Sequence, residues 1–248
     1  KKAEDIIRAK LLKDTVKSEI LENLLTESYE HSIIPQVRVI DAVNFLDNKA
    51  MTLCIPAVSV KKNGENEDYE LVGCAVYDET GKVSKFLSTE EAEGIAFLNN
   101  DVREGFFTET LPSGEKATFV INKSKTKFDV KTTNGNLNYY LTVNISCDLD
   151  EIGERERQKA DTEILADLKK TVQKAVTKRM ESTLNALQKA DGGDCVRYCK
   201  ILELKKPELY KTVDDSWKSV FMNVKTFVAV NVTIRRIGEE TLKTNETA

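Results

Sequence analysis

The residues that most often carry out catalysis do not stand in a catalytic arrangement in this chain. Its 248 residues contain a single histidine, His31, which lies between Glu30 and Ser32 and shortly before a proline. A Ser-His-Asp or Cys-His site would have to use this residue, and no nucleophile-elbow motif lies near it. We therefore expect His31 to be a surface residue at a helix end.

The cysteines are odd in number and scattered along the sequence. They are Cys54, Cys74, Cys147, Cys195 and Cys199. The first three lie in apolar, strand-like runs, where a thiol is usually a small buried hydrophobic group. The last two are one helical turn apart, without a CxxC pair, and the sequence does not decide whether they are oxidised. We expect structural thiols, and a disulfide or a metal role is the alternative.

Other motifs also favour a protein that is not an enzyme. Neither a G-x-G-x-x-G nor a G-x-x-x-x-G-K-[ST] phosphate loop is present. Carboxylates lie in mixed runs such as Glu151 to Glu156, whose simplest interpretation is the solvated start of a helix. The net charge of −4, from 37 basic and 41 acidic residues, argues against nucleic-acid binding. We predict no catalytic, cofactor-binding or metal-binding residues.

One long helix, from residue 155 to residue 190, organises the rest of the chain. Its apolar residues recur at helical spacing and form a stripe roughly 140° wide, which fits a helix clasped by a sheet. Gly192-Gly193 marks its C-terminal end. The stripe consists of Ile164, Leu165, Leu168, Val172, Ala175, Val176, Leu187 and Ala190, with Met180 at its edge.

Two long alternating patterns predict strands with one apolar face. The first runs from Leu137 to Cys147, after the probable hairpin turn at Asn134-Gly135, and the second runs from Val220 to Ile234. Shorter strands are expected within residues 71–77, 83–87, 105–110, 117–122 and 126–131, and the capping box Ser88-Thr-Glu-Glu91 predicts a helix to about Leu98. The predicted fold is α+β, with an antiparallel sheet curved around the long helix.

The first 65 residues form a smaller, mostly helical unit in this prediction. An apolar run at Met51–Val60 contains Pro56, which a central strand would not tolerate. The polar stretch Lys61–Asp68 is predicted to be a linker, so we place the boundary between a partial domain (1–65) and a second domain (66–248) there.

No run of 18 apolar residues predicts a transmembrane helix. The chain opens Lys1-Lys2, without an initiator methionine or an apolar leader. We therefore expect a fragment, with any export signal or lipid attachment outside it.

A series of short motifs occurs in order between residues 70 and 238. They are Gly73-Cys-Ala-Val-Tyr77 with Gly81-Lys-Val83, Lys123-Ser-Lys-Thr-Lys127, Trp217-Lys-Ser-Val-Phe221 and Ile234-Arg-Arg-Ile-Gly238. Together they resemble the C-terminal region of the spore germination C-subunit family, Ger(x)C, and residues 3–60 resemble, more loosely, the end of its middle domain. The segment Cys195–Lys200 departs from the family pattern, which usually contains Gly and Phe there.

The resemblance implies a non-catalytic C subunit of a nutrient germinant receptor. It would work with membrane-embedded A and B subunits, and a lipid anchor absent from this fragment would tether it to the outer face of the spore inner membrane. A solute-binding module that itself holds a germinant such as an amino acid or sugar is the alternative, and a carboxylate-dependent hydrolase is a third. The candidate partner contacts are Tyr140, Tyr198, Tyr210 and Trp217, with core packing as the alternative for Trp217.

Overall fold

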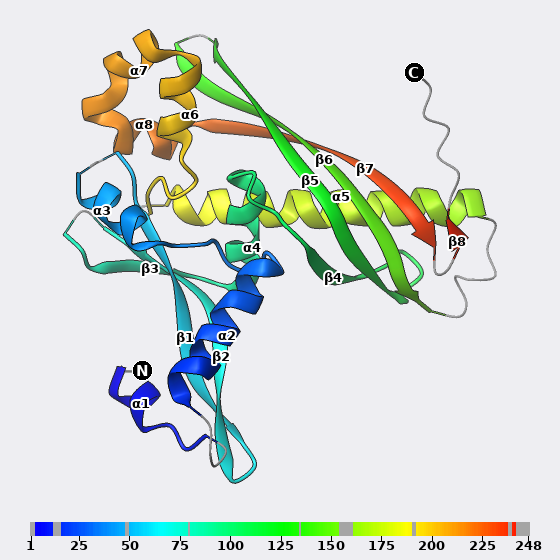
Figure 1. The fold of residues 1–248 in the computed structure, drawn as a ribbon. Helices are drawn as coiled ribbons and strands as arrows, with labels where there is room; N and C mark the ends of the chain where they lie inside the picture. Colours follow the sequence, from blue (N-terminus) through cyan, green and yellow to red (C-terminus); the bar gives the residue numbers. More distant parts are fainter. Residues whose placement is uncertain are drawn as a thin grey trace.

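The computed structural model describes residues 3–11, 16–47, 50–78, 80–133, 135–153, 161–189, 192–237 and 240–241 (Figure 1). Its strands form two sheets. The smaller sheet contains β1 (Leu53–Asn63), β2 (Asn66–Tyr77) and β3 (Val83–Leu87), in that order. The larger contains β4 (Gly105–Thr110), β5 (Lys116–Thr133), β6 (Asn136–Ile152), β7 (Lys225–Ile237) and β8 (Glu240–Thr241), also in that order. The predicted α+β class is confirmed.

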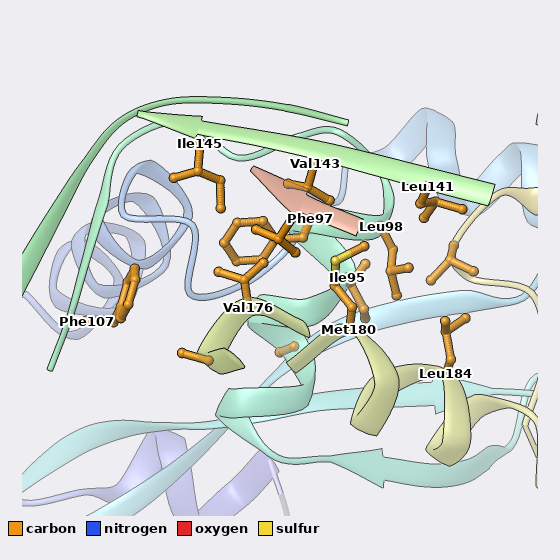
Figure 2. Close-up of a cluster of buried hydrophobic side chains, with 14 of the residues drawn as sticks. Ile95, Phe97, Leu98, Phe107, Leu141, Val143, Ile145, Val176, Met180 and Leu184 are labelled. Atoms are coloured by element: carbon orange, nitrogen blue, oxygen red, sulfur yellow. The ribbon is translucent and has the colours of Figure 1, made fainter. Parts of the chain in front are cut away.

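The long helix α5 (Asp161–Leu187) lies across the larger sheet, whose strands cross above it in Figure 1. Its apolar stripe is buried as predicted, and Leu168, Val172 and Val176 are each 0% exposed. Figure 2 shows Val176, Met180 and Leu184 of α5 facing Leu141, Val143 and Ile145 of β6. The predicted helix residues 155–160 and Ala190 lie outside the described part of the chain.

The larger sheet is mixed, because β7 pairs with β6 in parallel while its other described pairs are antiparallel. A parallel pair needs a long crossover connection. Here α5 carries the chain back along the sheet, and α6 (Tyr198–Lys205), α7 (Pro207–Val213), the 3₁₀ turn η2 (Asp214–Ser216) and α8 (Trp217–Asn223) follow before β7 begins. Strand β7 therefore starts at the same end of the sheet as β6.

The prediction of a strand from Val220 onward is wrong for its first residues. Val220 and Met222 belong to α8, and β7 begins only at Lys225. Trp217 and Phe221 are four residues apart and each 1% exposed, so this turn of helix buries its two largest side chains together. The alternation from Val220 to Val224 fits a strand equally well, and tertiary packing decides in favour of the helix.

The polar stretch predicted to be a linker is the tip of a hairpin instead. Lys61 pairs with Asp68, and Asn63 pairs with Asn66, around Gly64 at φ +63°. Polar residues suit a solvated hairpin tip as well as a linker. Pro56 lies in β1, an edge strand, as its missing N–H requires. The division into units 1–65 and 66–248 stays a prediction.

Three helices are the regular elements described within the first 50 residues. Helices α1 (Ala3–Arg8), α2 (Lys17–Glu30) and α3 (Val39–Asp47) precede β1. After α2, Ser32 adopts φ +59°, and its hydroxyl donates to the Glu104 carbonyl at 2.8 Å and accepts from the Arg103 N–H at 2.9 Å. These two hydrogen bonds join the turn after α2 to Arg103 and Glu104, which directly precede β4.

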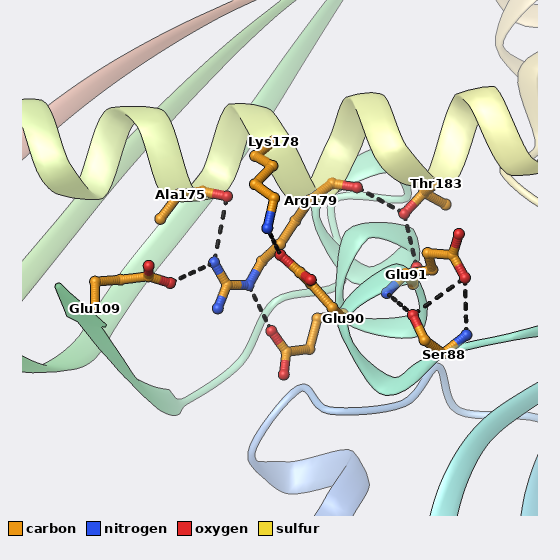
Figure 3. Close-up of polar contacts among 9 residues, drawn as sticks. Ser88, Glu90, Glu91, Glu109, Ala175, Lys178, Arg179 and Thr183 are labelled. Carbon is orange, nitrogen blue, oxygen red and sulfur yellow. Dashed lines mark hydrogen bonds and ion pairs between the residues drawn. The ribbon is translucent and has the colours of Figure 1, made fainter.

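Helix α4 (Thr89–Leu98) packs against both α5 and β2, and the predicted capping box of Ser88 and Glu91 is present. The two helices approach most closely at Gly94, where a Cβ atom would lie 2.0 Å from the Thr183 hydroxyl. Figure 3 shows Arg179 of α5 bonded to Glu109 of β4 at 2.8 Å, and the same guanidinium bonds Glu93 of α4 at 2.6 Å. One guanidinium therefore joins three elements.

Strand β5 is continuous where two shorter strands were expected. Its pairing with β6 contains a register shift between Ile121 and Lys123. The predicted hairpin turn includes Asn134, which lies outside the described residues, although Thr133 and Asn136 on either side are paired and Gly135 has φ +78°.

Candidate functional site

A pocket of about 380 Å³ lies where four segments of the chain meet. One wall is the segment from Pro35 to Phe45, which includes most of α3. The start of β1, from Met51 to Cys54, provides a second wall, and Ile95 and Asn99 at the end of α4 provide a third. The fourth wall consists of Cys195 and Arg197, which precede α6, and Lys200 of α6 itself.

The buried part of the pocket is apolar. Ile95 is 1% exposed, and the thiols of Cys54 and Cys195 belong to residues that are also buried. Hydrogen bonds with the thiols of Cys195 and Cys74, and then burial, raise the pKa of Cys54 well above its usual range. All five cysteines are free and buried in the structure, which confirms the prediction of structural thiols.

Charged groups of both signs reach the pocket. Arg197 and Lys200 are exposed cations, and Asp41 of α3 is a half-buried anion. Burial alone would raise the pKa of Asp41, but hydrogen bonds from Arg38 and the charges of Arg38 and Arg197 together lower it. The Arg38 backbone N–H donates to Asp41 Oδ2 at 2.8 Å. Asp41 is therefore ionised at neutral pH.

Arg197 is held in a left-handed conformation, with φ +59° and ψ +29°, which few non-glycine residues adopt. The buried side chain of Asp194, which is 2% exposed, accounts for this backbone conformation. Its carboxylate accepts the N–H groups of Tyr198 at 2.9 Å and Cys199 at 2.7 Å and the indole N–H of Trp217 at 3.0 Å. We call these four residues, Asp194, Tyr198, Cys199 and Trp217, the Asp194 hub. The hub fixes the backbone on both sides of Arg197.

Burial raises the pKa of Asp194, and the N–H donors of Cys199, Tyr198 and Trp217 act against that shift. Gly193 precedes the hub, and a Cβ atom there would lie 1.9 Å from the Thr52 hydroxyl, so only glycine allows β1 to approach this closely. The backbone N–H of Thr52 donates to the Asp194 carbonyl at 3.2 Å.

Asn99 carries an unsatisfied acceptor. Its Nδ2 donates to the Cys195 carbonyl at 3.4 Å, while its Oδ1 is shielded from solvent. Among the buried side-chain polar atoms of the described residues, this oxygen is the one without a hydrogen-bond partner. A buried acceptor without a donor is unfavourable, so the position calls for an explanation.

The four aromatic residues proposed as partner contacts do not converge on one surface. Tyr198 and Trp217 are 0% and 1% exposed, so the exposure predicted for them is wrong, and the core alternative for Trp217 is correct. Tyr198 stacks on Tyr139 with ring centroids 4.1 Å apart, which explains its burial. Tyr140 and Tyr210 are half-buried, and their role in partner contacts stays a prediction.

His31 is exposed at the C-terminal end of α2, as predicted, and its ring meets Phe106 edge to face at 5.7 Å. Sequence reasoning did not identify Asp41, Asn99 or Arg197 as a group. They come from distant segments without a shared motif. The one available signal was the departure of residues 195–200 from the Ger(x)C pattern.

One protein-family model matches most of the chain. The model described as "Spore germination B3/ GerAC like, C-terminal" matches residues 72–238. The match covers strands β4 to β7 of the larger sheet, α5 and the helices that follow it.

Two curated proteins of Bacillus subtilis (strain 168) are similar to the chain. "Spore germination protein YndF" is 26% identical over 176 residues, which cover 69% of this chain and 42% of that protein. "Spore germination protein KC" is 22% identical over an alignment of 254 positions, which covers 96% of this chain and 62% of that protein. The chain therefore spans less than two thirds of the length of either relative.

The fold is also similar to a solved structure, the "Crystal Structure of the GerBC protein". The TM-score is 0.70 at 21% sequence identity, and the match covers 82% of this chain and 62% of that one. At this identity the likeness concerns the fold.

Proposed function

The chain belongs to the spore germination B3/GerAC-like C-terminal family, as its motifs predicted, and on this premise we propose that it acts in spore germination as the C subunit of a nutrient germinant receptor. The single observation that carries the proposal is the family match over residues 72–238. The names of both similar B. subtilis proteins refer to spore germination, which supports it.

We infer that the subunit works through protein contacts rather than by catalysis. Exposed apolar side chains support this role, because large ones gathered together mark interaction surfaces. Val39, Ile40 and Val43 of α3 are 84%, 51% and 44% exposed, and we call these three the α3 patch. The proposed partners are the membrane-embedded A and B subunits of the receptor.

The proposed location is the outer face of the spore inner membrane, where a lipid anchor outside residues 1–248 would hold the subunit. Among the described residues, no helix is long and apolar enough to cross a membrane. Within that part of the chain, no three His, Cys, Asp or Glu side chains are placed to hold a metal ion.

The proposal can be tested in sporulating cells with a tagged, full-length form of the protein. We expect affinity purification from the solubilised spore inner membrane to recover the A and B subunits. Val39→Glu combined with Val43→Glu should reduce that recovery at least about tenfold, by charging an apolar contact. The matched control is Leu204→Glu, because Leu204 is 83% exposed and belongs to a different helix, α6.

If neither subunit is recovered and spores without the gene germinate normally with every nutrient, the proposal is wrong. The alternative is a solute-binding module that itself holds an amino acid or a sugar. The pocket between α3, β1 and α6 is the observation that favours it. The third class, a hydrolase, would show activity on a panel of glycosides and esters.

A further inference from the structure

Side chains of opposite charge line the pocket. Asp41 stands on the α3 side, and Arg197 stands on the α6 side, close enough for its charge to lower the pKa of Asp41. Lys200 adds a second cation, although it also pairs with Glu203 at 3.2 Å. A ligand with one charge is attracted by one side and repelled by the other. A zwitterion is attracted by both.

The anionic side of the pocket suits a positively charged hydrogen-bond donor. Asp41 lines the pocket, and its pKa is lowered, so its carboxylate is ionised. An ammonium group has three N–H donors and no acceptor, so it fits beside the Asp41 carboxylate. A carboxylate fits the opposite side, where the Arg197 guanidinium presents a planar set of donors.

The remaining walls are suited to an apolar group. Phe45, Met51 and Ile95 contribute hydrocarbon surface, and the thiols of Cys54 and Cys195 are weak hydrogen-bonding groups. A sugar would place hydroxyl groups against these walls and leave them unsatisfied. A volume of about 380 Å³ lies at the small end of the range for ligand pockets.

The cation side is organised before any ligand arrives. The Asp194 hub bonds the two residues that follow Arg197, so the left-handed backbone at Arg197 is already fixed. Preorganisation reduces the entropy that binding must overcome.

We propose that the pocket between α3, β1 and the start of α6 binds a small α-amino acid with an apolar side chain. Its carboxylate contacts Arg197, its ammonium group contacts Asp41, and its side chain packs on Phe45, Met51 and Ile95. The inference depends on the pocket residues and not on membership of a receptor complex. It can therefore fail while the A and B subunits are still recovered, and the reverse also holds.

An NMR titration of the ¹⁵N-labelled 248-residue chain with L-valine tests the proposal. We expect saturable shifts of the Ile95, Asn99 and Arg197 amides with a Kd of about 1 mM or lower. Two analogues each remove one charged group. Isovalerate lacks the ammonium group, and L-valine methyl ester lacks the carboxylate. Each should bind at least about tenfold more weakly than L-valine, and D-glucose should cause no shift.

Variants identify the groups responsible. Arg197→Gln should weaken L-valine binding at least about tenfold, and Arg197→Lys should restore part of it. The matched control is Lys125→Gln, which removes an exposed cation of β5 outside the pocket and should leave the affinity unchanged. The spectrum without ligand shows whether each variant is folded.

Any of four results would overturn the proposal. One is the absence of any saturable shift up to about 50 mM L-valine, because binding that weak lies beyond a millimolar site. Another is equal binding of L-valine and its methyl ester, or unchanged binding in a folded Arg197→Gln variant. The last is a response to D-glucose alone, which would identify a sugar site.

Discussion

Around α5 the structure is held by apolar side chains that repeat at helical spacing, whereas around Asp194 it is held by hydrogen bonds to one carboxylate. Leu168 and Val172 are buried against the larger sheet and belong to a stripe of equivalent contacts. Asp194 has no equivalent, because three N–H groups from two segments depend on its two oxygens.

The two regions should therefore lose folding stability in different ways when their residues are substituted. Burial of apolar area is spread over many residues, so each truncation in α5 removes its own share and leaves the others. A buried polar cluster concentrates its contribution, because removal of the acceptor leaves every donor unsatisfied. Four substitutions test this contrast, in order of decreasing expected effect.

Trp217→Ala should have the largest effect, since Trp217 belongs both to the core and to the hub. We expect a loss of about 3–5 kcal/mol in the free energy of unfolding, measured by urea denaturation. Trp217→Phe keeps most of the apolar volume and removes the N–H donor, so it should cost about 1–3 kcal/mol. Equal costs for the two variants would mean that the hydrogen bond to Asp194 dominates.

Leu168→Ala tests the apolar region alone. Leu168 is 0% exposed and lies between α5 and the sheet, so its truncation should cost about 2–5 kcal/mol in the same measurement. The control is Leu204→Ala, at a residue 83% exposed, which should change stability by less than about 0.5 kcal/mol. A small effect at Leu168 would contradict the packing of α5 on the sheet.

Asp194→Asn keeps the size of the side chain and removes one acceptor oxygen. The amide N–H₂ then faces an N–H group of the hub, and we expect a cost of about 1–3 kcal/mol. Asp215→Asn, at an exposed position of η2, should have almost no effect. If Asp194→Asn lowered the free energy of unfolding no more than Asp215→Asn does, the contrast between the two regions would be contradicted.

Glu93→Gln should have the smallest effect, visible as a change in how the free energy of unfolding depends on pH. Burial, opposed by Arg179, raises the pKa of Glu93 above the ordinary glutamate value of 4.5. The folded chain therefore binds more protons than the unfolded chain just above that value, and wild-type stability falls as the pH rises through this window.

Glu93→Gln removes this titration. The stability of the wild type relative to the variant should fall as the pH rises above 4.5. A constant difference above that pH would show that the Glu93 carboxyl titrates normally in the folded protein.

The same contrast explains which parts of the fold were predictable. The α5 stripe, the alternation of β6 from Leu137 to Cys147 and the capping box at Ser88 are repeated or local patterns, and all three are confirmed. The short helix α8 was not predicted, because seven residues give too little periodicity to outweigh the alternation that starts at Val220.

The candidate site was unpredictable for a different reason. Asp41, Asn99 and Arg197 meet only because α3, α4 and the segment before α6 are brought together by the fold. Their residue types are ordinary on protein surfaces, and the left-handed backbone at Arg197 results from Asp194, three residues earlier. Neither composition nor periodicity contains that information.

The parallel pairing of β6 with β7 has a consequence for how the protein reaches its native state. Asn144 and Asn231 are neighbours across this pair although they are 87 residues apart in the chain. Until β7 has been synthesised, one edge of β6 and the face of α5 that β7 covers are open to water. We expect the sheet to close slowly, since such distant contacts must form against a large loss of chain entropy. During that interval the nascent chain is most vulnerable to aggregation.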